Sequence, residues 1–269
     1  MMPRREGEGV PGGRERPFLQ KPQGVVSVVG GVVAIVAAVL AMVFDLFPGC
    51  EPRPPQPKLE LSVVDVAREK DIVADWTVDD EPQPAMKDWS SSVLSIALRN
   101  RSDDEVMLTD ADFAIESVTQ LGCPYGAGAS IVTARYDIKV PPGFTPPDTL
   151  TRRVPHEVPA HGTERIGFTI GPEVQPAGAL PTVYTFTVTL AGDDGSRLTT
   201  DRVVFMNPQH TEAVLEAAAN AVQHGTGPTT PKCVREQARK ARELAGSARL
   251  VAPELKEYSK ALNKIAGGP

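Results

Sequence analysis

The feature that most constrains this chain is an uncharged apolar run at residues 24–44, which reads GVVSVVGGVVAIVAAVLAMVF. The run is 21 residues long and its only polar side chain is Ser27. A helix of this length spans about 31 Å, which matches the hydrocarbon core of a bilayer. A helix buried in a globular core would show a polar stripe, and this run has none. We therefore expect one transmembrane anchor helix over residues 24–47, ended by Pro48 and Gly49.

Two kinds of cleaved N-terminal leader are alternatives to a retained membrane anchor. A secretory signal peptide has a shorter apolar region of about 7–15 residues, followed by small residues at the cleavage site. Here the bulky Leu46 and Phe47 follow a longer run. A lipoprotein leader would attach lipid to Cys50, and Gly49 fits that pattern, but Phe47 stands where such leaders carry leucine. The sequence favours an uncleaved anchor with Cys50 as an ordinary thiol.

The charges beside the run predict its orientation. Five basic side chains precede it and two follow it closely: Arg4, Arg5, Arg14, Arg16 and Lys21, then Arg53 and Lys58. Positively charged flanks remain in the cytoplasm. We therefore expect a cytoplasmic N-terminus, a single pass through the cell membrane, and most of the chain outside.

Small residues recur every fourth position within the run, at Gly30, Ala34 and Ala38. This spacing lets two helices approach closely, so the span could form a homodimer. The same spacing also arises by chance in any anchor rich in Val, Ala and Gly, and we favour that simpler interpretation.

Composition divides the rest of the chain into four parts. Residues 1–23 are rich in charge, glycine and proline and cannot bury a core, so we expect a disordered basic cytoplasmic tail. Residues 48–57, PGCEPRPPQP, contain five prolines and predict an extended stalk. Such a stalk reaches up to about 31 Å. Residues 58–206 carry short alternating apolar runs, and residues 207–269 have a helical pattern.

Residues 58–206 predict a mainly β domain. In TVYTFTVTL, the side chains of Tyr184, Phe186, Val188 and Leu190 share one face, as in a half-buried strand. Similar runs lie at 59–63, 72–78, 94–98, 106–118, 132–140, 166–170 and 198–206, and Asp194-Gly195 predicts a hairpin. No long helical run separates them, which favours a two-sheet antiparallel β-sandwich. The pattern resembles immunoglobulin-like ectodomains at the level of the fold.

Residues 207–269 predict three helices. They cover 211–224, a segment from Pro231 after a Thr230 cap, and a segment from Pro253. Their apolar stripes are thin, so we expect them to pack on the sandwich, on each other and on a partner. These residues carry nine basic and six acidic side chains, whereas residues 58–206 carry 13 basic and 23 acidic ones. The basic side chains could face the acidic sandwich, anionic lipid or an envelope polymer, but a solvated helix face is the interpretation we favour.

The sequence predicts no catalytic, cofactor or metal site. His156 and His161 are five residues apart and Pro155 and Pro159 break any helix, so they miss the spacing of a zinc-binding helix. We expect a surface loop there. Acidic clusters such as Asp193-Asp194 lack the alternating oxygen ligands of a calcium loop. The motifs of serine hydrolases and phosphate-binding loops are missing. A net charge of −6 also argues against nucleic acid as a partner.

The three cysteines are Cys50, Cys123 and Cys233. An oxidising compartment would permit a bridge between Cys123 and Cys233, which would join the helical segment to the sandwich. Closing a loop of about 100 residues is worth roughly 4–5 kcal/mol on chain-entropy grounds. Three free thiols, or a Cys50–Cys50 bridge between two chains, are the alternatives.

These patterns together predict a single-pass membrane-anchored, non-catalytic extracytoplasmic binding module. Its expected partners are the lipid bilayer and an unidentified protein or envelope polymer. The alternatives are an accessory or regulatory subunit of a membrane protein complex and a hydrolase whose site is dispersed over loops of the sandwich.

Overall fold

The computed structural model describes residues 58–125, 131–133, 136–176, 178–207, 210–225 and 227–267. The predicted tail, span and stalk lie outside these residues, and so do Gly30, Ala34, Ala38 and Cys50. Among the helices that are described, none is both long and apolar enough to cross a membrane. The chain divides into Met1–Gln56 and a compact unit Pro57–Pro269, and the second unit is the one described below.

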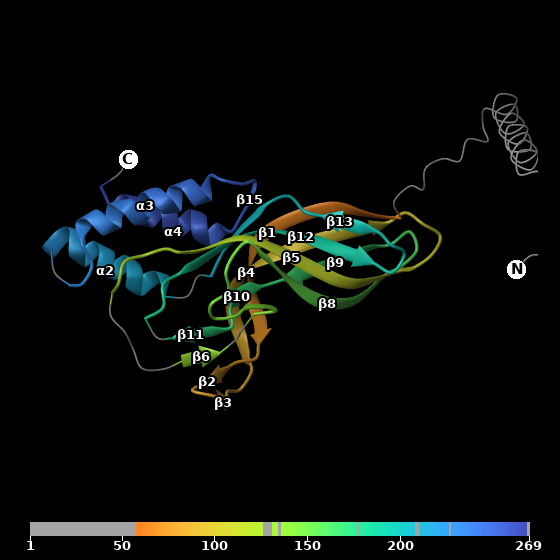
Figure 1. Cartoon of the computed structure of the whole chain (residues 1–269), viewed down its shortest axis with the longest axis horizontal. Helices are drawn as coiled ribbons and strands as arrows, with labels where there is room; N and C mark the ends of the chain where they lie inside the picture. Colours follow the sequence, from red (N-terminus) through yellow and green to blue (C-terminus); the bar gives the residue numbers. More distant parts are fainter. Residues whose placement is uncertain are drawn as a thin grey trace, which may run out of the picture. The chain divides into compact units, whose positions relative to one another are not determined.

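The compact unit is mainly β, with three helices near its C-terminal end (Figure 1). Its strands are β1 Leu59–Ala74, β2 Thr77–Val78, β3 Glu81–Pro82, β4 Met86–Asn100, β5 Val106–Gln120, β6 Ile131–Thr133, β7 Ile138–Val140, β8 Asp148–Val158, β9 Thr163–Phe168, β10 Ile170–Pro172, β11 Val174–Pro176, β12 Thr182–Gly192, β13 Arg197–Thr199, β14 Val203–Met206 and β15 Leu250–Val251. Its helices are α2 Thr211–His224, α3 Pro231–Ala245 and α4 Pro253–Ile265.

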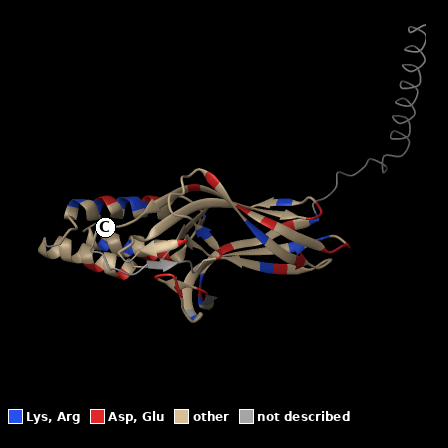
Figure 2. Cartoon of the chain, turned by 60° about the horizontal axis from the view of Figure 1, so that its bottom comes forward, with Lys and Arg blue, Asp and Glu red and all other residues tan. Residues whose placement is uncertain are grey.

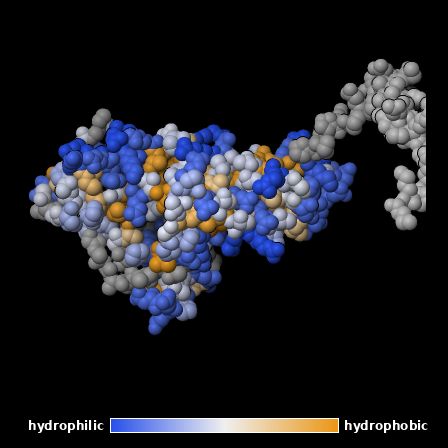
Figure 3. Space-filling model, viewed as in Figure 1, coloured by the Kyte–Doolittle hydropathy of each residue, from blue (hydrophilic) through white to orange (hydrophobic). Residues whose placement is uncertain are grey.

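Two larger sheets form the body of this unit. One has the order β1-β4-β9, and the other has the order β15-β14-β12-β5-β8 with β13 also paired to β12. Phe113 of β5 and Phe168 of β9 meet edge to face, with ring centroids 5.2 Å apart, so the two sheets share one core. This arrangement is consistent with a β-sandwich. Among the described residues, Val63 and Val222 are the exposed large apolar side chains, and Figure 3 shows hydrophobic colour only in small patches.

Residues 132–140 do not form the single strand that their alternation predicts. They divide into β6, which pairs with β11 and β2, and β7, which pairs in parallel with β10. The intervening Tyr136 is buried, stacks edge to face on Trp89 and lies so close to Gly171 that a Cβ there would be 2.1 Å from its ring. The parallel pair β7–β10 contradicts the antiparallel pairing predicted for residues 58–206. Strand β15, from outside that range, also pairs in parallel with β14.

The sequence analysis does not predict strand β8, and its prediction of a loop around His156 is wrong. His156 lies within β8, whereas His161 follows it in a turn. The alternation of apolar and polar residues in β8 is weak because only Val158 of this strand is buried. Strand β8 lies at the edge of its sheet and pairs only with β5. Pro155 is tolerated because it sits where the β5–β8 register shifts.

The hairpin predicted at Asp194-Gly195 is confirmed between β12 and β13, with Gly195 at a φ of 83°. The run at 198–206 divides into β13 and β14, since Thr200 leaves the ladder and its hydroxyl accepts a hydrogen bond from the Val188 amide. An alternating pattern indicates which face a side chain takes, but it does not say where a strand breaks.

The three predicted helices are confirmed. Helix α2 has the expected bounds, α3 begins at Pro231, and α4 begins at Pro253. The Thr230 hydroxyl accepts a hydrogen bond from the Cys233 amide and caps α3, as the Thr-Pro pair predicts. The helices bury thin stripes, including Val234 and Ala238 of α3 and Leu255 of α4. Helix α4 contacts β1 and β14, so the helical segment packs on the sheets.

Candidate functional site

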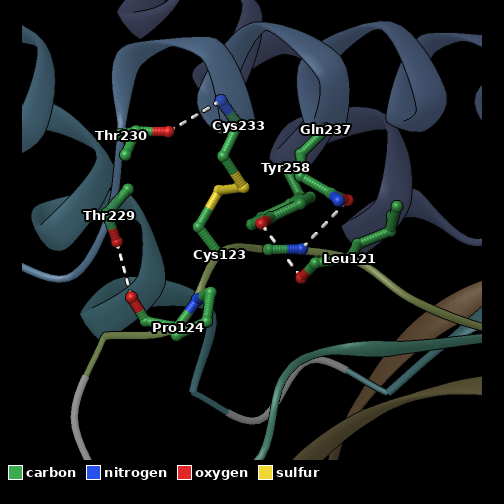
Figure 4. Close-up of a disulfide and its surroundings, with 9 residues drawn as sticks. Leu121, Cys123, Pro124, Thr229, Thr230, Cys233, Gln237 and Tyr258 are labelled. Carbon is green, nitrogen blue, oxygen red and sulfur yellow. Dashed lines mark hydrogen bonds between the residues drawn. A yellow bond between two sulfur atoms is a disulfide. The ribbon is translucent and has the colours of Figure 1, made fainter.

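The helices meet the sheets at a junction that contains the only disulfide among the described residues (Figure 4). Cys123 follows the end of β5, and Cys233 lies in the first turn of α3. Their Cα atoms are 6.2 Å apart across a sequence separation of 110 residues. The structure therefore brings these two sequence-predicted residues together and joins the helical segment to a strand in the body of the larger sheet.

Hydrogen bonds reinforce the disulfide on both sides. Each one involves the backbone of the segment after β5: the Tyr258 hydroxyl donates to the Leu121 carbonyl, the Gly122 amide donates to the Gln237 side chain, and the Thr229 hydroxyl donates to the Pro124 carbonyl. Burial raises the pKa of the Tyr258 phenol, so this group remains a donor. The junction is thus held by polar contacts from α3, α4 and the loop before α3.

Gly122 is expected to be intolerant of a side chain. Its φ is 140°, and a Cβ would lie 2.8 Å from Val214 Cγ1 of α2. We expect Gly122→Ala to lower the free energy of unfolding by about 2–4 kcal/mol, through backbone strain and a clash with α2. Gly143→Ala is the control, because Gly143 also has a positive φ but no atom lies within 4 Å of its Cβ position. Denaturant unfolding that gave equal losses for both variants would contradict the packing argument.

A buried carboxylate connects α4 to β1 and β4. Glu254 is 6% exposed and lies in the first turn of α4. One of its oxygens accepts a hydrogen bond from Arg68 Nε at 2.8 Å, and the other accepts one from the buried Ser92 hydroxyl. Arg68 Nη2 also donates to Glu257 at 2.7 Å. Burying a carboxylate costs several kcal/mol unless it is paired and hydrogen-bonded, and here it is both.

The two glutamates raise the pKa of Arg68, with the hydrogen bond to Glu257 as the largest cause and the one to Glu254 next. Arg68 is therefore a permanent cation at this junction. Glu254 and Glu257 give the junction a net charge of −1 once Arg68 is counted.

A pocket of about 210 Å³ opens beside this ion pair, between β1, α2 and α4. Charged groups of Arg68, Glu254 and Glu257 line one part, and Leu215, Tyr258 and Ala261 line another, with Thr211 completing the wall. Drug-sized ligands usually occupy pockets of roughly 300–1,000 Å³. The pocket is thus better matched to one side chain of a protein partner than to a whole small molecule.

The two histidines singled out by their spacing do not converge. His156 Nε2 approaches Glu164 at 3.8 Å, and His161 Nε2 lies 2.9 Å from Asp103. Across the part of the chain that the structure describes, no group of three or more His, Cys, Asp or Glu side chains could hold a metal ion.

The sequence does not reveal the cluster of Arg68, Ser92 and Glu254. Arg68 and Glu254 are 186 residues apart, and Ser92 is 162 residues from Glu254. Arg68 falls in a charged stretch of β1, and Ser92 falls in a run of three serines. The only local signal is an acidic residue in the first turn of a helix, which is common on helix dipole grounds alone.

The chain matches no protein-family model and no curated protein. Among solved structures it is similar to the X-ray structure of a Northeast Structural Genomics Consortium target, SoR45. The identity is 9%, the alignment covers 57% of this chain and 89% of that chain, and the TM-score is 0.25. A likeness this weak carries no argument about fold or function.

Proposed function

We propose that this protein is a non-catalytic binding module, held outside the cell by a single N-terminal membrane span. The observation that carries the proposal is the Cys123–Cys233 disulfide at the helix–sheet junction. Disulfides persist in secreted and envelope compartments and are rare in the cytosol. The uncharged run at residues 24–44 and the positive charge before it support the same placement.

The proposed module is an immunoglobulin-like β-sandwich extended by a helical segment. Support comes from the two larger sheets, which face each other across Phe113 and Phe168. The helical segment would complete the module rather than form a separate domain, because the disulfide and Glu254 both fasten it to strands.

The state of the ionised groups supports binding rather than catalysis. A general base needs an available lone pair directed at a substrate proton. In the pocket, each oxygen of Glu254 already accepts a hydrogen bond, and Arg68 is shared between two carboxylates. Glu254 and Arg68 thus hold α4 in place, and the exposed carboxylate of Glu257 remains able to receive a polar side chain of a partner.

Cysteine labelling in intact cells tests the placement. In a full-length Cys50→Ser background, we expect Lys240→Cys to react with a membrane-impermeant maleimide, because Lys240 is exposed on α3. Arg5→Cys should react only after permeabilisation, because it precedes the proposed span. The opposite pattern, or protection of Lys240→Cys until lysis, would refute an extracytoplasmic module.

A further inference from the structure

The cations of α3 and α4 form a surface that the contacts with the sheets leave unused. We call it the basic face and define it as the exposed residues Lys232 and Arg235 of α3 with Lys256, Lys260 and Lys264 of α4. None of the five forms an ion pair with another described residue, although other arginines of the unit do. Figure 2 shows Lys and Arg, with Asp and Glu between them, on the helices near the C-terminus.

The helix–sheet contacts remove one explanation of these charges. If the basic helices packed their cations on the acidic strands, α4 would meet β1 through its lysines. Instead α4 meets β1 through its acidic residues, since Arg68 of β1 binds Glu254 and Glu257. The three lysines of α4 therefore stay in solvent.

One cation of each helix lies at the border between the two helices. Arg242 of α3 donates a hydrogen bond to Asn263 of α4, which marks where the two helices touch. Arg235 lies two turns before Arg242 and so faces the same side of α3, and Lys256 stands in the same relation to Asn263 on α4. The cations of the two touching helices repel one another, and a bound anion would relieve the part of that repulsion that Glu236, Glu243 and Glu257 leave.

The spacing of the lysines favours a long partner. Lys256, Lys260 and Lys264 recur every four residues, so their stripe extends over about 12 Å. A single phosphate or carboxylate is bound where cations converge, whereas a stripe matches a chain of repeating anions. Four of the five residues are lysines, whose compact charges suit general attraction to a polyanion better than the bidentate recognition typical of arginine.

The basic face lies far from Lys58, which is the first residue that the structure describes. Arg68, which contacts α4, lies in β1, ten residues after Lys58. Ten residues of extended strand span about 33 Å. The choice of a polymer from the cell envelope rests on the proposed function.

We propose that the basic face binds a linear polyanion of the cell envelope. The test uses the full-length protein in nanodiscs of phosphatidylcholine and fluorescent long-chain inorganic polyphosphate, followed by anisotropy at 50 and 200 mM NaCl. The wild-type protein should bind polyphosphate, and the binding should weaken at the higher salt concentration. Lys256→Gln/Lys260→Gln/Lys264→Gln should weaken binding by roughly tenfold or more.

The matched control removes three exposed strand cations, in Lys87→Gln/Arg99→Gln/Lys139→Gln, and so changes the net charge equally. It should alter the affinity less than about twofold. The proposal that the basic face binds a polyanion would be overturned if the wild-type protein did not bind polyphosphate. It would also be overturned if the two triple variants lost affinity equally. If vesicles of phosphatidylglycerol bound more tightly than polyphosphate through the same lysines, the partner would be lipid and the polymer proposal would be wrong.

The failure of this proposal and the failure of the proposed function are distinguishable. Polyphosphate binding with the predicted loss, combined with an unlabelled Lys240→Cys in intact cells, would retain the basic face and reject the external placement. Labelling of Lys240→Cys in intact cells without polyphosphate binding would retain the external placement and reject the basic face as a polyanion site. Unchanged thermal unfolding of both triple variants shows that the lost binding is not lost folding.

Discussion

Replacement of Glu254 by alanine should lower the free energy of unfolding of this unit by about 3 kcal/mol. The substitution leaves the buried Ser92 hydroxyl without its acceptor and takes one of two carboxylates from Arg68. It also opens a gap between α4 and β1, where the pocket already lies. In a thermal unfolding experiment, the loss corresponds to a fall in Tm of roughly 6–12 °C for a unit of this size.

Glu257→Ala is the matched control for this prediction. Glu257 binds the same arginine, but its side chain is 64% exposed. Exposed ion pairs contribute less than about 1 kcal/mol, so this variant should unfold close to the wild-type temperature. Similar losses for the two variants would show that the burial of Glu254 contributes nothing beyond a surface ion pair.

Removal of the disulfide in Cys123→Ala/Cys233→Ala should cost about 3–5 kcal/mol, because the bond closes a long loop in the unfolded chain. The loss of stability should appear first as local opening of the helical segment. We expect faster amide hydrogen exchange over 230–245, while the amides of β5 and β12 remain protected by the sheet ladder between them. The hydrogen bonds of Tyr258 and Gln237 would then be the main links between the helices and the end of β5.

A reducing agent provides the internal control. Reduction should lower the Tm of the wild-type protein and of Cys50→Ser by the same amount, and it should leave the double variant unchanged. A wild-type protein whose Tm is insensitive to complete reduction would contradict a stabilising role for the bond.

The helices could be predicted from the sequence because residues close to each helix end determine where the helix begins. Thr230 caps α3 through a residue three positions away, and prolines at 231 and 253 fix the first turns of α3 and α4. The hairpin at Asp194-Gly195 is local in the same sense. Each of these features depends on a few adjacent residues, so no knowledge of the rest of the fold is needed.

The sheet pairing could be predicted only in part. The core faces of β4 and β12 follow from their alternation, and Leu94, Ile96, Phe186 and Val188 are buried as expected. The opposite face of β4 is buried too, at Val93, Ser95 and Ala97, so β4 is not the half-buried strand that its alternation predicts. Strand β8 could not be predicted because an edge strand needs no apolar face. The division of 132–140 depends on where Trp89 and Gly171 place Tyr136, and these residues are distant in the sequence.

The polar junction lies beyond local sequence reasoning for the same reason. Arg68, Ser92 and Glu254 become neighbours only after β1, β4 and α4 have packed. Cysteine pairing could be proposed from the sequence as one of several options, since only three cysteines are present. Cys123 and Cys233 could not be selected among these options without the placement of α3 against the end of β5.

The most direct test of an envelope-exposed, disulfide-closed module is the state of its thiols in cells. Cells that express the full-length protein would be quenched with an alkylating reagent, and peptides would be mapped without reduction. We expect one linked pair of peptides carrying Cys123 and Cys233, with Cys50 alkylated. Recovery of alkylated Cys123 and alkylated Cys233 as the main species would contradict both the crosslink and the compartment inferred from it.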